Sequence, residues 1–513
     1  MVLLLGLDVG TTSVKAGLFD AAGTCLAVAG EEYHLDHPAP DRAELDAETY
    51  WRASQVAIRR AVAAAGAGRE DVAALAVSSQ GETVVPVDAA GRALGPALVW
   101  LDNRALAESR EIAEVFGESS IYDVTGVPSV VPTWSACKIL WWRRHAPDLF
   151  ARARRFLLVE DLLLHRLTGR FVTEGGVHCT SLLFDIRNHA WWDDMLGVVG
   201  IDSSRLPELA RPGDVVGTLT TDAAEALGLS RRLLVVAGGM DQGAGAIGVG
   251  NVGPGIVSES TGGALTLQAA VDHHGGDPTR QTPVYVHSAP GMYLYCPVCP
   301  TGGMALTWFR DQFGSDEVTR AANEGRNAYD LLIALAGHIP PGSEGLLMLP
   351  HLMGAFSPEY EPEARGAFYG FTLRHGKGHF VRAVLEAVAF MLRRNLELLA
   401  GAGATAEEIR SHGGGARSDL WNQIKADVCA RPVVTLAGDD AAIRGDAMLA
   451  GVAAGVFPDL AEAGRALVTT KRRFVPDPSA SAVYEEAYAG YIRLFDLLRP
   501  LFARPDAGGH TTR

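Results

Sequence analysis

The chain has 513 residues, which favours two or three domains, each large enough to bury its own core. Hydrophobic residues make up 48% and charged residues 20%, which is typical of a folded globular protein and not of a disordered one. The formal net charge is −15 and no basic run is present, so nucleic acid and an anionic membrane are disfavoured as main partners.

The amino terminus and the cysteines indicate a cellular setting. The first ten residues are apolar, but they lack a basic start and Asp8 interrupts them, so they predict neither a signal peptide nor a membrane span. Six cysteines in 513 residues fit a reducing cytoplasm better than a disulfide framework. Cys296 and Cys299 form one CxxC pair, but a zinc site needs a second pair of ligands. We therefore expect a cytoplasmic protein and assign this pair no metal or redox role.

The first half of the chain predicts three strands, a helix and a fourth strand. In chain order these are residues 2–7, 14–19, 25–29, 51–65 and 72–77. Residues 21–23 read as a hairpin turn, and polar residues follow two of the strands at 8–12 and 78–82. The polar clusters at strand ends are the positions at which we look for chemistry.

A related pattern starts again in the second half. A strand at 233–237 ends in the polar residues 238–241, and an apolar run at 255–257 leads into the polar stretch 258–265. Further on, the sequence predicts a helix, a strand and a last helix at 380–399, 409–411 and 481–501. We place the lobe boundary near 242–255 and expect lobes at 1–245 and 246–480, followed by a helix and frayed tail at 481–513.

The residues after the first strand favour the handling of phosphate. Gly10 lets the backbone turn its amide groups towards an anion, and the hydroxyls of Thr11 and Thr12 add donors. Lys15 supplies a nearby positive charge. Asp8 would repel a phosphate, so its expected role is to hold Mg²⁺ directly or through water. The alternative is a β-hairpin that happens to be polar.

Two later loops extend this interpretation. Thr261, Gly262 and Gly263 form a matching loop in the second half, and Gly413, Gly414 and Gly415 form a third turn before a helix. A backbone without side chains allows a flat uncharged group such as adenine to lie against it. Each glycine run alone is weak evidence, because most such runs are turns, but three in this order favour a nucleotide.

Residues 243–248 match the GxGxxG pattern of dinucleotide-binding folds. They lie in mid-chain, no acidic residue follows at a second strand end about 20 residues on, and the charge of Asp241 just ahead would repel a pyrophosphate. We therefore expect these glycines to allow close helix packing. The dehydrogenase interpretation is the weaker alternative.

Asp241 is the candidate general base. It stands at a strand end among glycines, where a substrate can approach closely. Kinases that phosphorylate hydroxyls need a carboxylate that accepts the substrate proton and orients the oxygen towards the γ-phosphate. The alternative is a structural aspartate that caps the following helix.

Taken together, these residues resemble the FGGY carbohydrate kinases over almost the whole chain, roughly residues 3–500. The motifs occur in family order and include Lys15 and the segments 8–12, 100–104, 138–141, 238–242, 366–371, 379–386, 413–417 and 421–423. The resemblance implies an α/β protein with two ribonuclease-H-like, actin-like ATPase lobes and a cleft between them that closes on ATP, Mg²⁺ and a sugar. It implies a small sugar or polyol as partner, with neither nucleic acid nor membrane, and it allows a homodimer.

The resemblance also implies a set of site residues. Asp241 is the expected base and Asp8 the expected Mg²⁺ residue, possibly acting through water. The expected substrate residues are Gln80, Gly81, Glu82, Asp102, Arg104, Asp241 and Gln242. The expected ATP residues are Thr11, Thr12, Ser13, Lys15, Thr261, Gly262, Gly303, Thr307, Gly414, Gly415, Ala416 and Asn422.

Departures from the family pattern bear on the substrate. Gly81 and Glu82 stand where the xylulokinase branch carries Met-His, and they resemble the Arg-Glu-Thr of the glycerol kinase branch without its arginine. Gln242 also agrees with the glycerol kinase branch, whereas Thr133 replaces its tyrosine. We expect Gly81 to leave room for a longer or branched substrate.

Xylulokinase-like phosphorylation of a ketose is the leading interpretation. A glycerol- or tetritol-type polyol kinase is the close alternative because of Glu82 and Gln242. A non-catalytic actin-like ATP-binding sensor is the third, and Asp241 argues against it, because a sensor needs no carboxylate beside the phosphates.

Overall fold

The computed structural model describes residues 2–275, 277–438 and 440–502. The contacts divide them into two compact units, one formed by residues 2–254, 270–295 and 440–469 and the other by residues 255–269, 296–438 and 470–502. The units interleave along the chain, whereas consecutive segments are expected from the sequence. Each unit mixes helices and strands, so the two-domain α/β class predicted from the sequence is confirmed.

The first unit contains most of the strands. They are β1 Leu3–Val9, β2 Ser13–Asp20, β3 Cys25–Glu32, β4 Glu44–Leu45, β5 Val72–Ser79, β6 Val84–Val87, β7 Ala97–Leu98, β8 Arg155–Leu158, β9 Val172–Glu174, β10 Phe184–Asp185, β11 Ala190–Trp191, β12 Glu208–Ala210, β13 Val215–Thr218, β14 Leu234–Met240, β17 Val284–Val286 and β18 Tyr293–Tyr295. Its helices are α1 Glu48–Ala64, α2 Leu106–Phe116, α3 Glu118–Thr125, α4 Ser135–His145, α5 Pro147–Arg152, α6 Val159–Thr168, α7 Gly175–His178, α8 Asp193–Val199, α9 Thr221–Leu227, α10 Asp241–Gly248, α16 Ala441–Ala453 and α17 Leu460–Leu467.

The main sheet of this unit has the strand order β13-β14-β5-β1-β2-β3. β14, β5 and β1 are parallel, and β1, β2 and β3 are antiparallel. Successive side chains of a strand face opposite sides, so Leu3, Leu5 and Leu7 pack on the core that contains α1, α6 and α9. Leu4 faces the other way and packs on α16 and α17.

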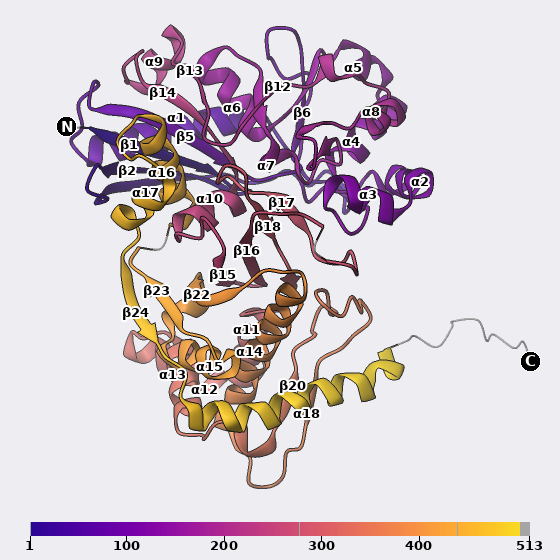
Figure 1. Cartoon of the computed structure of the whole chain (residues 1–513), viewed down its shortest axis with the longest axis vertical. Coiled ribbons are helices and arrows are strands. Elements are labelled where there is room, and N and C mark those ends of the chain that lie inside the picture. Colours follow the sequence, from indigo (N-terminus) through magenta and orange to yellow (C-terminus); the bar gives the residue numbers. More distant parts are fainter. Residues whose placement is uncertain (1, 276, 439, 503–513) are drawn as a thin grey trace, which may run out of the picture. The chain divides into compact units, whose positions relative to one another are not determined.

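Helix α16 comes from the far end of the sequence but packs on the first strands. Figure 1 shows α16 and α17, drawn in yellow-orange, beside the indigo strands β1 and β2. Gly6 allows this approach, because a Cβ there would lie 2.0 Å from the carbonyl oxygen of Ile443. The side chains of Ile443 and Ala447 therefore pack on this face of the sheet.

Of the glycines in the GxGxxG segment, Gly248 serves helix packing as expected, whereas a Cβ on Gly243 would lie 2.6 Å from Oγ of Ser288 and one on Gly245 would meet nothing within 4 Å. These glycines lie in α10, which packs against α16. A Cβ on Gly248 would lie 1.8 Å from the carbonyl oxygen of Ala441, and one on Gly445 would lie 1.9 Å from that of Ala244. The two backbones thus touch at residues that only glycine can fill.

The second unit is built around a smaller sheet. Its strands are β15 Gly255–Thr261, β16 Leu265–Val271, β19 Val298–Cys299, β20 Leu347–Leu349, β21 Ala367–Tyr369, β22 Ala406–His412, β23 Val433–Leu436 and β24 Thr470–Phe474, and its helices are α11 Met304–Phe313, α12 Ser315–Glu324, α13 Ala328–Gly337, α14 Lys377–Gly401, α15 Asp419–Cys429 and α18 Pro478–Phe502. The strands follow the order β16-β15-β22-β23-β24, and β19 pairs with β16. β15, β22 and β23 are parallel.

Every strand and helix predicted from the sequence occurs, with ends displaced by a few residues. The largest difference is β15, which continues to Thr261 through polar residues that were expected to form a loop. The strand continues because Ser258 and Glu259 are buried and find polar partners inside the unit.

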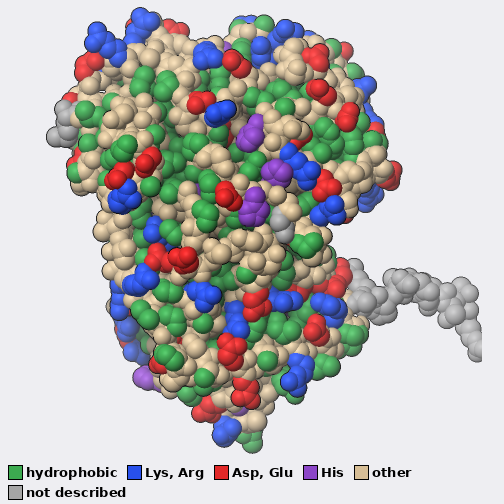
Figure 2. All heavy atoms as spheres, viewed as in Figure 1, with side chains coloured by type: hydrophobic (Ala, Val, Ile, Leu, Met, Phe, Trp, Pro, Cys, Tyr) green, Lys and Arg blue, Asp and Glu red, His purple; other side chains and the backbone are tan. Residues whose placement is uncertain are grey.

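Three further observations concern the surface, the helices and the cysteines. Acidic and basic side chains are interspersed over the face shown in Figure 2. Among the residues that the structure describes, no helix is both long and apolar enough to cross a membrane. The six cysteines form no disulfide bonds, and Cys296 and Cys299 are buried.

Candidate active site

Three carboxyl side chains meet at one edge of the main sheet. Asp8 is near the end of β1, Glu82 follows β5, and Asp241 begins α10 directly after β14. Because β1, β5 and β14 are parallel neighbours, their carboxyl ends lie at the same edge. The structure thus brings together residues separated by more than 200 positions.

Burial and mutual charge repulsion raise the pKa values of these three carboxyl groups. Burial raises the pKa of Asp241 to about 7, and the charge of Glu82 adds to this rise. Burial likewise raises the pKa of Asp8 to about 7, helped by Asp241 and opposed by Lys15. The pKa of Glu82 is also raised by burial, and the charge of Lys138 opposes this rise. Asp241 therefore has the proton affinity of a base that works near pH 7.

Asp241 is the first residue of α10 and not its N-cap. The N-cap residue Met240 makes no capping hydrogen bond, whereas the Asp241 carboxylate accepts a hydrogen bond from the Gln242 backbone, which partly offsets the rise of its pKa on burial. The N-cap alternative is therefore not supported at this position, and the role of Asp241 as base stays a prediction.

The loop between β1 and β2 is held in place from several sides. The carbonyl of Gly10 accepts hydrogen bonds from the Tyr33 hydroxyl at 2.5 Å and from Nε2 of Gln80 at 3.2 Å. Nε1 of Trp100 donates to Oγ1 of Thr11 at 2.8 Å. The loop is thus a fixed framework, which suits a site that must present amide groups in one geometry.

The remaining predicted residues of this loop are also located. The Thr12 carbonyl accepts from the Tyr33 amide at 2.9 Å, and Ser13 begins β2. Nζ of Lys15 lies 2.6 Å from Oδ1 of Asp440, so this lysine is paired within the unit.

Gln80 and Gly81 are buried beneath this edge of the sheet and are not exposed at its surface. Gln80 is 3% exposed; its Nε2 donates to Gly10 and to the Tyr50 hydroxyl, while its Oε1 has no partner. A Cβ on Gly81 would lie 2.7 Å from Oγ1 of Thr180 and 3.4 Å from the Met240 sulfur. The expectation that Gly81 leaves room for a longer substrate is therefore wrong, because Thr180 fills that space.

Asp102 and Arg104 bind each other. Asp102 has no exposed surface, and its two carboxyl oxygens accept hydrogen bonds from the Ala43 amide and from the Arg104 guanidinium. Arg104 also pairs with Glu44. That Asp102 and Arg104 contact a substrate directly stays a prediction. Such contact would need a polar atom of one of them to be exposed to the substrate. Gln242, by contrast, is exposed at the start of α10.

Two buried carboxyls behind the edge were not predicted from the sequence. Oε1 of Glu160 accepts from the amides of Gly238 and Gly239, three and two residues before Asp241. Asp446 accepts from the Ser78 hydroxyl at 2.8 Å, and burial raises its pKa well above the usual range. No local sequence signal marks either residue, because each reaches its partners only through the tertiary fold.

The second unit contains a pocket of about 330 Å³, within the size range of small-molecule sites. Six of the predicted ATP residues line it: Thr261, Gly262, Gly303, Thr307, Gly414 and Gly415. Tyr329, Asp330 and Trp421 also line it, together with apolar side chains such as Leu306. Tyr329 was missed because nothing in its local sequence separates it from other helical tyrosines; its hydroxyl lies 2.9 Å from Oγ1 of Thr307.

The glycine turn 414–417 is held from beneath. Nδ2 of Asn422, which is fully buried, donates to the carbonyl of Ala416 at 2.8 Å. A Cβ on Gly415 would lie 2.6 Å from Cβ of Thr261, so two of the predicted loops are in direct contact.

A buried ion pair supports the loop at Thr261. Nζ of Lys425 lies 3.0 Å from both carboxyl oxygens of Glu259 and 2.9 Å from Oγ1 of Thr261, and neither member of the pair is exposed. The Thr261 hydroxyl also donates to Glu259. The Thr261 hydroxyl is therefore hydrogen-bonded inside the unit. At this position the loop offers mainly its backbone to a ligand in the pocket.

Asp8 fits a magnesium ion by its chemistry. No group of three or more His, Cys, Asp or Glu in residues 2–275, 277–438 and 440–502 is arranged to hold a metal. Mg²⁺, however, usually binds through one or two carboxylates, with water and phosphate oxygens as its other ligands. The proximity of Asp8 and Asp241, which raises the pKa of Asp8, is a concentration of negative charge that a cation would relieve.

Comparisons with known proteins identify the family. The model of the FGGY family of carbohydrate kinases, N-terminal domain, matches residues 3–248, and that of the C-terminal domain matches residues 271–454. The chain is 30% identical to a xylulose kinase of Escherichia coli over 98% of this chain and 100% of the relative, and 31% identical to an autoinducer-2 kinase of Enterobacter over 94% and 92%. The crystal structure of xylulose kinase from Rhodospirillum rubrum superimposes with a TM-score of 0.90 at 30% identity, covering 98% of this chain and 100% of that one. The resemblance seen in the motifs is thus confirmed, and the chain belongs to the FGGY family of carbohydrate kinases and is an ATP-dependent kinase of a carbohydrate hydroxyl.

Proposed function

We propose that the chain transfers the γ-phosphoryl group of ATP to a hydroxyl of D-xylulose or a related ketose, with Asp241 as the general base. The observation that carries this proposal is the place of Asp241 at the end of β14, beside Glu82, with its pKa raised to about 7. A base with this pKa is ionised often enough at neutral pH and still holds a proton well. Relatives named as xylulose kinases support the choice of a ketose.

The proposed step uses residues of the sheet edge. The Asp241 carboxylate accepts the proton of the substrate hydroxyl while that oxygen bonds to the γ-phosphorus and ADP leaves. Glu82 accepts hydrogen bonds from neighbouring substrate hydroxyls, Gln242 accepts or donates them, and the buried Gln80 supports the β1–β2 loop from beneath. Bound Mg²⁺, held by Asp8 directly or through water, would neutralise phosphate charge.

For the adenosine part of ATP, we propose the pocket of the second unit. The backbone at Gly262, Gly303, Gly414 and Gly415 can lie close to a flat ring, and Tyr329 offers an aromatic face. The amides of residues 11–13 are proposed to bind phosphate oxygens.

A polyol of the glycerol or tetritol type is the second candidate, favoured by the Glu82 carboxylate and by Gln242. A homodimer and a cytoplasmic location also remain proposals. A sensor without kinase activity is set aside, because the chain belongs to a family of kinases.

The test is ADP release with a panel of substrates. Purified protein, ATP and Mg²⁺ are mixed with D-xylulose, other ketoses, tetritols, glycerol and the substrate of autoinducer-2 kinases. We expect one ketose to raise ADP release far above the rate without sugar, and we expect chelation of Mg²⁺ to abolish the increase. A polyol as best substrate would replace the first candidate with the second, and no response to any compound would contradict both.

A further inference from the structure

Glu82 sits at the centre of a strained turn. Its φ is 57°, in the left-handed region, and the Thr83 amide donates to the Gly81 carbonyl at 2.6 Å, which closes a three-residue turn. Such turns are rare for residues with a side chain and persist only where neighbouring groups hold them. The question is therefore which groups hold this one.

Two side chains of α4 bind the carbonyl of Glu82. Oγ of Ser135 donates to it at 3.1 Å and Nζ of Lys138 at 3.2 Å. The two residues are three positions apart, so they lie on one face of the helix. Both are fully buried.

Lys138 also binds the segment that precedes Trp100. Its Nζ donates to the carbonyls of Val99 at 2.8 Å and Leu98 at 3.4 Å. An ammonium group has three donors, and the three carbonyls account for all of them. Trp100 adds a second link, because its amide donates to Oγ1 of Thr83 at 3.1 Å. Lys138 thus clamps two backbone segments to each other.

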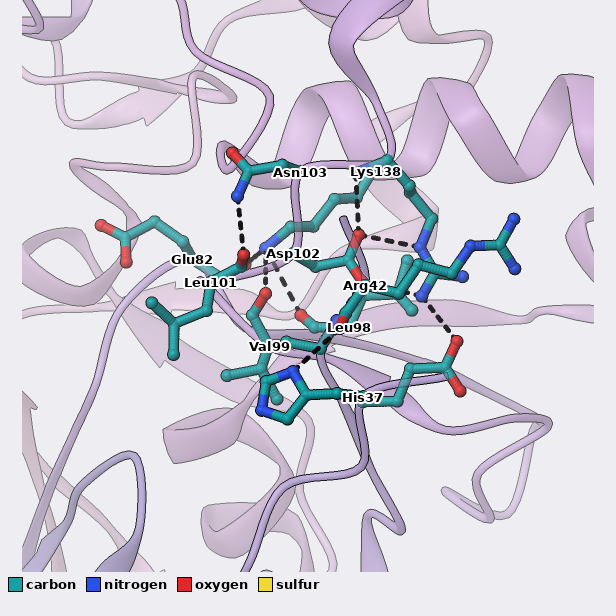
Figure 3. A network of polar contacts seen from close by, with 12 residues as sticks. His37, Arg42, Glu82, Leu98, Val99, Leu101, Asp102, Asn103 and Lys138 are labelled. Carbon is teal, nitrogen blue, oxygen red and sulfur yellow. Dashed lines mark hydrogen bonds and ion pairs between the residues drawn. The ribbon is translucent and has the colours of Figure 1, made fainter. Parts of the chain in front are cut away.

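Ser135 and Lys138 bind the backbone carbonyl of Glu82, so the carboxylate of Glu82 is not used by the clamp. Figure 3 shows the Glu82 carboxylate projecting away from the Lys138 amino group, while the dashed contacts of Lys138 run to backbone carbonyls. The negative charge of the Glu82 carboxylate raises the pKa of Asp241. The backbone of Glu82 is therefore fixed by Lys138, while the charge of its side chain acts on the proposed base.

We propose that Lys138 is a positioning residue for substrate specificity: by clamping the strained turn, it fixes which substrate hydroxyls Glu82 can recognise. This inference rests on the proposed function. It gives a role to one of only five lysines of the chain, and the role acts through Glu82 and not through contact with substrate. A neutral side chain of similar length cannot satisfy three carbonyls, so the turn should relax when Lys138 is replaced.

The experiment has two independent readouts. Lys138→Met, Ser135→Ala, Glu82→Ala and the double variant Lys138→Met/Glu82→Ala are compared with wild type, and Lys471→Met, at an exposed lysine, is the matched control. The first readout is amide hydrogen exchange of the full-length protein in residues 80–86 and 98–103, which requires no substrate. The second is the ratio of kcat/KM between the best sugar and its single-deoxy derivatives.

We expect Lys138→Met, and to a lesser extent Ser135→Ala, to speed exchange in both segments, whereas Lys471→Met leaves it unchanged. Lys138→Met should reduce the discrimination ratio to the level of Glu82→Ala, and the double variant should match the single ones within about twofold because both act on one contact. Unchanged exchange would overturn the clamp whatever the enzyme phosphorylates. Faster exchange with discrimination intact, or losses that add in the double variant, would overturn the role in specificity. A wild type that phosphorylates no sugar would instead refute the proposed function, while the exchange readout still decides whether Lys138 holds the turn.

Discussion

Glu160 is hydrogen-bonded to Gly238: its Oε1 lies 3.0 Å from the Gly238 amide nitrogen and 3.1 Å from that of Gly239. Glu160 is fully buried on α6, and Gly239 lies two residues before Asp241. The backbone that delivers the proposed base is thus held by a carboxyl from another element.

This contact predicts different outcomes for two substitutions of Glu160. Glu160→Gln keeps an acceptor oxygen for both amides, whereas Glu160→Leu leaves two buried donors unpaired at about 1–3 kcal/mol each. We expect Glu160→Gln to keep kcat within about tenfold of wild type and Glu160→Leu to lower it further, since about 1.4 kcal/mol of lost positioning is tenfold in rate. Steady-state kinetics and unfolding curves measure this. Equal impairment of the two variants would show that the charge of Glu160, and not its acceptor, matters.

The pKa values of the site predict the pH dependence of activity. The pKa of Asp241 is raised to about 7, and this carboxyl must be ionised to accept a proton, so kcat/KM should fall as pH drops through about 7. The charge of Glu82 contributes to the raised pKa, so Glu82→Gln should move the fall to lower pH. Glu114→Gln, at an exposed position, is the control. A flat profile from pH 5 to 8 would refute these assignments.

Glu82 should determine which hydroxyls are accepted. An ionised carboxylate accepts hydrogen bonds only, and a substrate that offers no donor leaves it unpaired. We expect Glu82→Ala to lower kcat/KM for the best substrate by about 10–200-fold and to narrow the gap to its deoxy derivatives. If discrimination is unchanged, Glu82 is not a substrate residue, and the argument for a polyol loses its main support.

How far the sequence predicts this protein depends on whether a signal is local. The loops at Asp8, Asp241 and Gly414 are local: a strand ends, glycines permit a turn, and polar residues follow. Their positions could therefore be predicted, as could the family. The clamp of Lys138 on Glu82 could not, because the partners are 56 positions apart and a lysine in a helix is usually exposed.

The same limit explains the other surprises. Helix α16 was not predicted, and its place in one core cluster with Leu4 has no local signal, since any apolar helix face would give the same pattern. The polar half of β15 was taken for a loop because burial of Glu259 depends on Lys425, far away in sequence. The room expected at Gly81 is filled by Thr180, which no property of residue 81 reveals.

Two neighbouring glycines allow a matched test of the nucleotide pocket. A Cβ on Gly415 would lie 2.6 Å from Cβ of Thr261, whereas one on Gly414 would lie 3.8 Å from its nearest neighbour, the Thr261 carbonyl oxygen, which is an ordinary contact. Gly415→Ala should therefore displace the Thr261 loop and raise the KM for ATP by about tenfold, the effect of about 1.4 kcal/mol. Gly414→Ala should raise it less, and the KM for the sugar should stay near wild type in both. Nucleotide binding by calorimetry would check the result; a normal affinity in Gly415→Ala would place ATP elsewhere.

The central claim is that Asp241 accepts the proton of a sugar hydroxyl during phosphoryl transfer from ATP. The most direct measurement compares wild type with Asp241→Asn for sugar-dependent ADP release, together with the binding of ATP and of sugar by calorimetry. Asn keeps the shape of the side chain but cannot take the proton, so kcat should fall by about 10²–10⁴ while both affinities stay close to wild type. Wild-type turnover by Asp241→Asn would contradict the account and move the base to another carboxylate.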